Sequence, residues 1–267
     1  MIRRQISPPS EAEWRTLKYN RTDRGFLTTM GVDLSTFDFL LVLFDREKPM
    51  RKRLVGGRPN LLDSESHLAF VLHFLSSRAE QNVIGRLFGL TPASSSNYIW
   101  RGIRILLKAL RKEHQARIQY PNSEEIHQLS MMLTVHEPCV QNVFGFLDGL
   151  NCPILNPEDQ IQQNAYYNGW KSVCFVSAVI LYAIDGSILW SSFNCPGSWH
   201  DAKIAQQLYE LLIHSTPVNY AVIADTAFPR NQDCKNRTIP LFLQSITESQ
   251  QSSIITSIRQ ATEWGMR

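Results

Sequence analysis

The spacing of apolar residues predicts helices in the first half of the chain. From residue 64, apolar positions recur at three- and four-residue steps, as expected for the core-facing side of one helix. These positions are Leu68, Val71, Leu72 and Leu75.

Two further helices are expected after this one. The segment Glu80–Phe88 has helical spacing, and Gly89 should end it because glycine readily adopts the left-handed conformation. Thr91 can cap a third helix, with Pro92 at its first position, where a missing N–H costs nothing. That helix should run to about Leu110. Its expected inward residues are Ile99, Ile103, Leu106 and Leu107.

The second and third of these predicted helices are joined by a tight glycine turn. Two helices joined in this way make a helix-turn-helix candidate.

The start of the third helix bears small polar residues, followed by arginines, on the side expected to face outward. Short polar side chains allow close approach to base edges or phosphates, and arginines supply charge for phosphates. The predicted DNA contacts are Ser95, Asn97, Arg101 and Arg104. A plain helical bundle with a basic surface explains the helix pattern equally well.

After about residue 140 the apolar pattern becomes that of strands. Val143–Leu147 predicts a buried strand that stops at a turn formed by Asp148-Gly149. Lys171–Ala183 and Ser187–Phe193 predict two strands around Asp185-Gly186, a dipeptide that favours hairpin turns.

A helix and another strand should follow this hairpin. Ser198 is expected to cap a helix of roughly residues 199–213, Tyr220–Ala224 predicts a buried strand, and residues 252–267 predict a last helix. The order strand, hairpin, helix, strand, intervening segment, helix is the opening topology of a ribonuclease-H-like fold. We therefore expect an α/β catalytic domain of that class, preceded by an all-α helix-turn-helix region.

We expect four segments: an N-terminal helical and loop extension (1–60), a helix-turn-helix-like DNA-binding region (61–118), a linker (119–140) and a catalytic domain (141–267). Charge supports this division. Residues 1–118 contain 20 Lys and Arg against 11 Asp and Glu, whereas residues 119–267 contain 7 against 13. A basic first half suits a polyanion and an acidic second half suits cations, although solvated charge alone explains many such splits.

Cysteines and apolar runs exclude several classes of protein. The five cysteines are odd in number and form no CxxC pair, which argues against a disulfide framework and a zinc ribbon. The longest apolar stretch, Val173–Ile184, is too short to span a bilayer, and the N-terminus opens without a hydrophobic signal segment. We expect a soluble intracellular protein with no membrane partner.

Acidic residues follow the predicted strands. Asp148 and Asp225 each come after an apolar run, and adjacent strands ending at one edge would bring them together. Asp201 lies in the first turn of a predicted helix, and Glu263 lies on the last one. One aspartate after a strand is more often a turn or cap residue. The joint pattern favours a site that holds two divalent cations for phosphodiester cleavage.

Other candidate residues have a structural explanation. His200, beside Asp201, could ligate metal or act as a general base, but a histidine in a helix's first turn is more often structural. Trp170, Trp190 and Trp199 more often pack in the core or at its edge than stack on bases.

Four ordered motifs resemble those of Harbinger-type transposases and the nucleases derived from them. They are FLDG at 146–149, CPGSWHDAKI at 195–204, ADTAFP at 224–229 and SIRQATEWGMR at 257–267. The resemblance covers roughly residues 140–267, and residues 64–112 also resemble the helix-turn-helix that precedes the catalytic domain in that family.

This resemblance implies a DDE-type endonuclease that uses Mg²⁺ or Mn²⁺. By position, Asp148 matches the first acid, Asp225 the second and Glu263 the final glutamate, while Asp201 matches an additional acid often counted among the metal ligands. The implied partner is DNA and the implied location is the nucleus. An accessory DNA-binding protein and a homo-oligomer are both compatible with it.

The sequence departs from the family pattern at two points. Ala224 stands where the family commonly has glycine, and the chain stops at Arg267, where the family usually continues, so we expect a C-terminally truncated domain. One alternative is therefore a domesticated or degraded copy that binds DNA or a protein partner without cutting. Another is a hydrolase of a different phosphorylated substrate, against which the basic first half argues.

Overall fold

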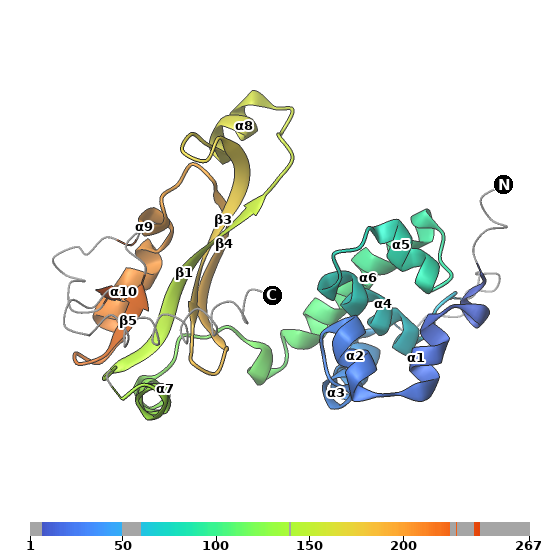
Figure 1. Ribbon diagram of the computed structural model, residues 1–267, viewed down its shortest axis with the longest axis horizontal. Coiled ribbons are helices and arrows are strands. Elements are labelled where there is room, and N and C mark those ends of the chain that lie inside the picture. Colours follow the sequence, from blue (N-terminus) through green and yellow to red (C-terminus); the bar gives the residue numbers. More distant parts are fainter. Residues whose placement is uncertain (1–6, 50–59, 139, 225–227, 229–237, 241–267) are drawn as a thin grey trace. The chain divides into compact units, whose positions relative to one another are not determined.

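The computed structural model describes residues 7–49, 60–138, 140–224, 228 and 238–240. The chain forms two compact units, Met1–Arg117 and Ile118–Arg267. The described part of the first unit is helical, and the second contains a sheet with helices (Figure 1).

Six α-helices and two short 3-10 turns make up the described part of the first unit. Their bounds are η2 Pro9–Glu11, α1 Trp14–Asn20, α2 Asp23–Met30, α3 Leu34–Glu47, α4 Ser64–Ser76, α5 Gln81–Leu87, α6 Pro92–Leu110 and η3 His114–Ala116. One hydrophobic core contains residues from α1 to α6. Within it, the rings of Trp14 and Phe88 stack with their centroids 5.4 Å apart. Helices from the expected extension 1–60 and the expected region 61–118 therefore share one core.

Helix α4 lies in the middle of this core. Its residues 66–72 are all buried, which means that neighbours surround the helix on every side. Gly102 of α6 allows one of these neighbours to come close, because a Cβ there would stand 2.7 Å from Nε2 of His67. The expected apolar stripe is correct for Leu68, Val71 and Leu72 but wrong for Leu75, which is 58% exposed at the end of α4.

The two helices of the helix-turn-helix candidate form as the sequence predicts. Gly89 has φ +70° after α5, and the Thr91 hydroxyl accepts a hydrogen bond from the backbone N–H of Ser94 at the start of α6. One inward position was wrong. Leu107 is exposed, whereas Ile105, which the stripe did not include, is buried.

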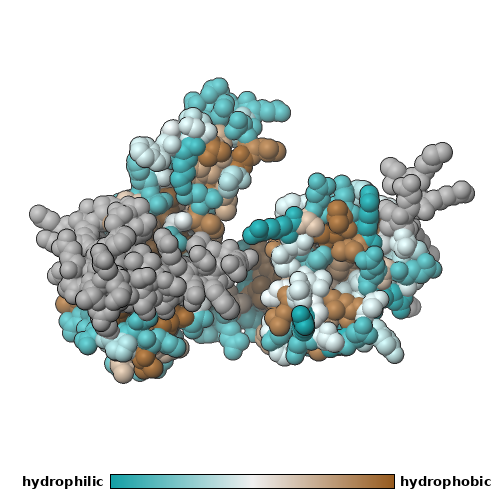
Figure 2. All heavy atoms as spheres, in the orientation of Figure 1, coloured by the Kyte–Doolittle hydropathy of each residue, from teal (hydrophilic) through white to brown (hydrophobic). Residues whose placement is uncertain are grey.

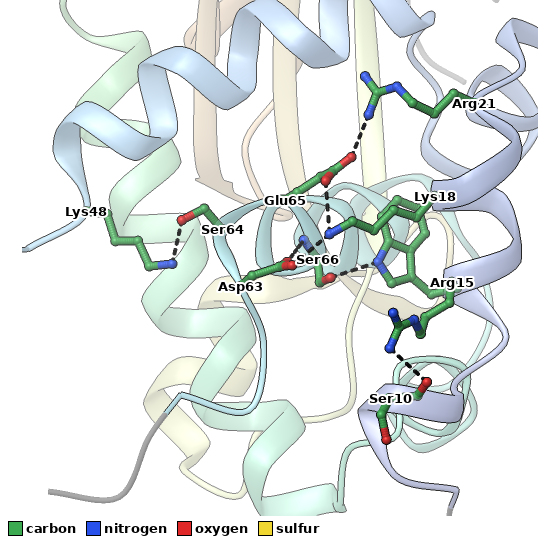
Figure 3. Close-up of polar contacts among 10 residues, drawn as sticks. Ser10, Arg15, Lys18, Arg21, Lys48, Asp63, Ser64, Glu65 and Ser66 are labelled. Carbon is green, nitrogen blue, oxygen red and sulfur yellow. Dashed lines mark hydrogen bonds and ion pairs between the residues drawn. The ribbon is translucent and has the colours of Figure 1, made fainter.

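Ion pairs join α1 to the N-terminal end of α4 (Figure 3). Lys18 Nζ lies 2.7 Å from Asp63 Oδ2 and 2.9 Å from Glu65 Oε2, and Arg21 also pairs with Glu65. Burial alone would raise the pKa of Asp63, but hydrogen bonds from Lys18 and Ser66 outweigh it and lower this pKa to about 2. The Asp63 carboxylate thus stays ionised while it caps α4.

The second unit is built around a sheet. Its described elements are α7 Ser123–His136, β1 Val143–Pro153, α8 Gln160–Tyr166, β2 Tyr167–Asn168, β3 Val173–Tyr182, β4 Ile188–Pro196, α9 Asp201–Ile204, α10 Gln206–His214, β5 Ala221–Ala224 and β6 Thr238–Pro240. The strand order is β2-β3-β1-β5-β6, and β4 also pairs with β3.

The direction of these strands identifies the fold. β1, β3 and β4 form an antiparallel meander, whereas β5 lies parallel to β1 on its other side and β6 lies parallel to β5. An antiparallel three-stranded meander extended by parallel strands beside the first strand is the arrangement of a ribonuclease-H-like sheet. The predicted fold class is confirmed.

Two hydrophobic clusters cover the sheet. Phe144 and Leu147 of β1 pack in a cluster that includes residues of α9 and α10, while Phe146, two positions from Phe144, packs with Ile223 and Leu133. Leu133 belongs to α7, so the segment 119–140 that we expected to be a linker contributes a helix to this core.

Three boundaries in the second unit differ from the prediction. β1 does not stop at Asp148 but continues to Pro153, because its antiparallel pairing with β3 extends to the pair Pro153↔Phe175. The helix expected at 199–213 is divided into α9 and α10 at Ala205. Its N-cap is His200, which makes no side-chain cap, rather than Ser198. The hairpin around Asp185-Gly186 is confirmed, with Gly186 at φ +84°.

Surface apolar residues are scattered among polar ones, as Figure 2 shows for one face. No described helix alone is long and apolar enough to cross a membrane; α2 and α3 pass that test only as a pair, which is bent by 65°. Cys152, Cys174 and Cys195 are free thiols.

Candidate active site on the central strand

Asp148 lies within β1, the strand that joins the two halves of the sheet. It pairs with Ile180 of β3, and its Oδ1 accepts a hydrogen bond of 2.7 Å from the backbone N–H of Gly149. Burial raises the pKa of Tyr182, and the charge of Asp148 raises it further. The half-buried carboxylate therefore lies near enough to Tyr182 of β3 for its charge to act on the phenol, and it is hydrogen-bonded to the backbone of β1.

Asp201 is brought to the same strand by the first turn of α9. Its Oδ2 lies 2.9 Å from the position that a Cβ would occupy at Gly149, and its Cγ lies 3.2 Å from it. A side chain at position 149 would displace this carboxylate, so glycine there lets Asp201 come close to β1. The sequence pattern predicted a turn at Asp148-Gly149 and did not indicate that Gly149 makes room for Asp201. The two residues are 52 positions apart, so residue spacing near Gly149 gives no sign of the contact.

Asp225 and Glu263 lie outside the described residues, but the strand that leads to Asp225 is described. β5 ends at Ala224, which pairs in parallel with Leu147 of β1. Leu147 immediately precedes Asp148, and Ala224 immediately precedes Asp225. β1 and β5 are neighbouring strands, as expected, but Asp148 lies within β1 rather than after it, and the place of Asp225 stays a prediction.

The described donors suit a hard cation. Asp148 and Asp201 offer carboxylate oxygens, which Mg²⁺ and Mn²⁺ prefer. Within residues 7–49, 60–138, 140–224, 228 and 238–240, no group of three or more His, Cys, Asp or Glu side chains is placed to hold a metal ion. The described part of the chain thus contains two of the four expected acids: Asp148 in β1, and Asp201 in α9 with its carboxylate close to Gly149.

The predicted DNA contacts in α6 do not all face the same way. Asn97 and Arg104 are exposed and Arg101 is half-buried, but Ser95 is completely buried. Ser95 faces α5, where its hydroxyl would collide with any Cβ at Gly85. The expected outward position of Ser95 is therefore wrong. Small residues at both positions let the two helices approach closely.

A lysine that the sequence pattern did not single out lies near Arg101. Burial lowers the pKa of Lys48; the charge of Asp45 raises it, and that of Arg101 lowers it. Lys48 also donates a hydrogen bond to the Ser64 hydroxyl at the start of α4 (Figure 3). Lys48 at the end of α3 thus lies within electrostatic range of Arg101 on α6.

The chain is similar to solved structures and to one protein family, but no curated protein matches its sequence. Among solved structures, the mariner Mos1 paired end complex with Mg is 11% identical, with 84% of this chain and 71% of that chain covered and a TM-score of 0.21. A pre-cleavage Mos1 transpososome is 9% identical, with 95% and 77% covered and a TM-score of 0.19. At such TM-scores the fold assignment rests on strand order alone.

The match to a protein family covers the candidate site. Residues 147–267 match the family described as DDE superfamily endonuclease. The matched range begins one residue before Asp148 and includes Asp201, Asp225 and Glu263. Residues 147–267 are therefore similar to the DDE superfamily endonucleases.

Proposed function

We propose that the second unit cleaves phosphodiester bonds in DNA, using divalent cations held by Asp148, Asp201, Asp225 and Glu263. The observation that carries this proposal is the parallel pair Leu147↔Ala224, because an acid follows each of these two neighbouring residues. The packing of Asp201 against Gly149 adds a third carboxylate at the same strand.

The carboxylates act as ligands in this proposal, and the chain orients them before substrate arrives. The backbone N–H of Gly149 holds Asp148, and α9 holds Asp201 against β1. A divalent cation such as Mg²⁺ or Mn²⁺, held by these carboxylates, would supply activation of an attacking water and charge to offset that on the phosphate and the leaving oxygen. Ligands that are fixed in advance reduce the reorganisation needed during the reaction.

DNA as the substrate is supported by the helical unit. Asn97 and Arg104 are exposed on α6, the second helix of the helix-turn-helix pair, and Arg101 lies between them. Residues 1–118 have an excess of basic over acidic residues, 20 against 11, which suits the phosphate backbone. In this proposal α6 positions the DNA, and the metal ions held by the carboxylates of the second unit promote its cleavage.

The same proposal includes the setting in which the protein acts. A DNA-cutting protein of this kind would work in the nucleus, assemble as a homo-oligomer on DNA and accept a separate DNA-binding protein as an accessory. Fluorescence imaging of a tagged chain tests the first of these points, and light scattering with and without duplex DNA tests the second.

Calorimetry with Mn²⁺ tests the site without requiring the correct DNA sequence. We expect the parent chain to bind Mn²⁺ and the Asp148→Asn and Asp225→Asn variants to lose that binding. Asp185→Asn is the matched control, because Asp185 lies in the β3–β4 hairpin turn, where asparagine can accept the same hydrogen bonds from Ser187.

Plasmid nicking with Mg²⁺ or Mn²⁺ then tests cleavage by the same four proteins. Nicking by the parent and Asp185→Asn proteins alone supports the proposal. A folded parent chain that binds no Mn²⁺ and nicks no DNA contradicts it and favours the alternative of a copy that binds without cutting.

A further inference from the structure

A cavity of about 420 Å³ lies beside α9 in the second unit. Residues that line it come from β4, α9, α10 and the turn before α9, and they include Ser192, Trp199, Lys203, Gln206, Gln207 and Glu210. Its volume lies in the range of small-ligand sites. Unlike most such sites, it presents several polar side chains around one aromatic ring.

The ring and a cation in this cavity are already paired. Lys203 Nζ lies 3.9 Å from the centre of the Trp199 ring, yet 39% of the Trp199 surface remains exposed. An ammonium held over an indole is a favourable cation–π pair. A partly exposed aromatic ring beside a positive charge suits a ligand with a planar ring and an attached anion.

Glu210 narrows the class of ligand further. Its carboxylate lines the same cavity, with one oxygen 3.3 Å from His214 Nε2, so its negative charge disfavours a small free anion such as inorganic phosphate there. A nucleobase with an exocyclic amino group can instead donate a hydrogen bond to a carboxylate, as cytosine does. The amide groups of Gln206 and Gln207 can both donate and accept hydrogen bonds with a base edge.

The cavity is next to the candidate active site along the chain. Asp201, whose carboxylate packs against Gly149 of β1, lies between Trp199 and Lys203 in sequence. A ligand held by Trp199 and Lys203 is therefore held by the same turn that positions one of the proposed metal ligands.

We propose that this cavity binds one unpaired nucleotide of the DNA substrate beside the cutting site. Its base stacks on Trp199, and its phosphate lies toward Lys203. The inference rests on the proposed nuclease function, because the nucleotide is taken to belong to the strand being cut. The nucleotide must be unpaired, since a base that stacks on a protein side chain has left its own stack.

Binding of a fluorescent single-stranded 20-mer, followed by anisotropy in EDTA, tests this inference. We expect Trp199→Ala to weaken binding roughly 5- to 100-fold, the usual effect of losing one stacking platform. Trp199→Phe keeps an aromatic face and should restore most of the affinity. Lys203→Met should weaken binding and reduce the slope of log affinity against log salt by about 0.7, whereas Trp199→Ala should leave that slope unchanged.

A matched pair of residues in the same unit provides the control. Trp170 is 95% exposed and is followed by Lys171, whose Nζ lies 5.3 Å from the centre of the Phe175 ring. Trp170→Ala and Lys171→Met remove the same side-chain types away from the cavity and should bind like the parent chain. Equal affinity of Trp199→Ala and the parent overturns the inference, and so does an equal loss in Trp170→Ala.

The assay separates this inference from the nuclease proposal because it contains no metal. Absence of nicking together with Trp199-dependent binding overturns the nuclease proposal alone. Metal-dependent nicking that coexists with unchanged binding by Trp199→Ala overturns only the nucleotide cavity. Thermal unfolding of every variant shows whether a loss of binding is instead a loss of fold. If Trp199→Ala does not fold, Lys203→Met decides the test, because unchanged affinity and salt slope in that variant also overturn the inference.

Discussion

The carboxylate of Asp201 occupies the space that a side chain at Gly149 would need, with Oδ2 only 2.9 Å from the position of a Cβ. This contact joins α9 to the central strand at the residue that follows Asp148. The position of the Asp201 carboxylate on α9 therefore depends on the absence of a side chain at Gly149 of β1.

Gly149→Ala should consequently weaken Mn²⁺ binding without unfolding the second unit. The added methyl group displaces the Asp201 carboxylate, and displaced supporting groups typically reduce metal affinity roughly 10- to 100-fold. Calorimetry measures the affinity, and circular dichroism checks the fold. Gly169→Ala is the control, because a Cβ there meets no atom within 4 Å. Unchanged Mn²⁺ affinity in Gly149→Ala would separate Asp201 from the metal site.

Ser95→Ala should leave duplex DNA binding unchanged and should not destabilise the helical unit. Ser95 is buried, and its hydroxyl has no hydrogen-bond partner among the described residues. Removal of a buried hydroxyl without a partner should raise the free energy of unfolding by up to about 1 kcal/mol. Urea denaturation and DNA anisotropy measure the two effects. A marked loss of DNA affinity would show that Ser95 reaches the DNA after all.

Arg104→Gln should weaken duplex DNA binding and reduce its salt dependence. Arg104 is exposed on α6, and each lost phosphate contact reduces the slope of log affinity against log salt by about 0.9. Anisotropy titrations at several salt concentrations give this slope. Arg78→Gln serves as the control, since Arg78 precedes α5 and lies outside the predicted recognition helix. An identical slope in the parent and Arg104→Gln proteins would exclude a phosphate contact at this position.

The helical unit should lose stability as the pH falls from about 6.5 toward 4. Burial lowers the pKa of His67 to about 4, although its hydrogen bond to the Tyr98 carbonyl raises it; the charges of Lys48 and Arg101 lower it further. Because the unfolded state binds the proton more readily, stability is fully present above the unfolded pKa of about 6.5. The full loss by pH 4 is on the order of 3 kcal/mol.

Urea denaturation between pH 4 and 7.5 measures this loss. His67→Gln keeps a donor for the Tyr98 carbonyl and should remove most of the pH dependence in that window. His114→Gln, at an exposed histidine of the same unit, should keep it. An unchanged pH profile in His67→Gln would mean that other groups cause the acid sensitivity.

Helix α7 should depend on its N-terminal cap. The Asn122 side chain accepts hydrogen bonds from the backbone N–H groups of Glu124 and Glu125, and the Glu125 side chain accepts one in return from the Asn122 N–H. Asn122→Ala should lower the free energy of unfolding of the second unit by about 1 kcal/mol, whereas Asn122→Asp should not. Equal destabilisation by both substitutions would point to packing rather than capping.

Local sequence signals predicted those parts of the fold that depend on near neighbours. The start of α6 follows from Thr91 and Pro92, and the β3–β4 turn follows from Asp185-Gly186. Each of these features needs contacts only within a few residues. The alternation from helical to strand spacing near residue 140 was also sufficient to indicate a ribonuclease-H-like sheet, because element order restricts the possible topologies.

Features that depend on distant partners were missed. β1 continues past Asp148 because β3 pairs with it, and Ser95 is buried because Gly85 leaves room for it. Neither partner can be inferred from residue spacing. For the site, the sequence indicated Asp148 and Asp201, but the fit of Asp201 against Gly149 required the structure. Asp225 and Glu263 lie outside the described residues and stay predictions.

The position of β1 in the sheet also affects the order in which the second unit can fold. β1 pairs with β3 through Phe146↔Tyr182, residues close in sequence, but with β5 through Leu147↔Ala224, residues much further apart. Longer loops cost more entropy to close, and a ribosome releases the β3 and β4 strands first. The antiparallel meander of β1, β3 and β4 can therefore assemble during synthesis, while the other edge of β1 stays unpaired until β5 has been made. The β1–β5 pairing, which includes Leu147 just before Asp148 and Ala224 just before Asp225, therefore forms after the meander.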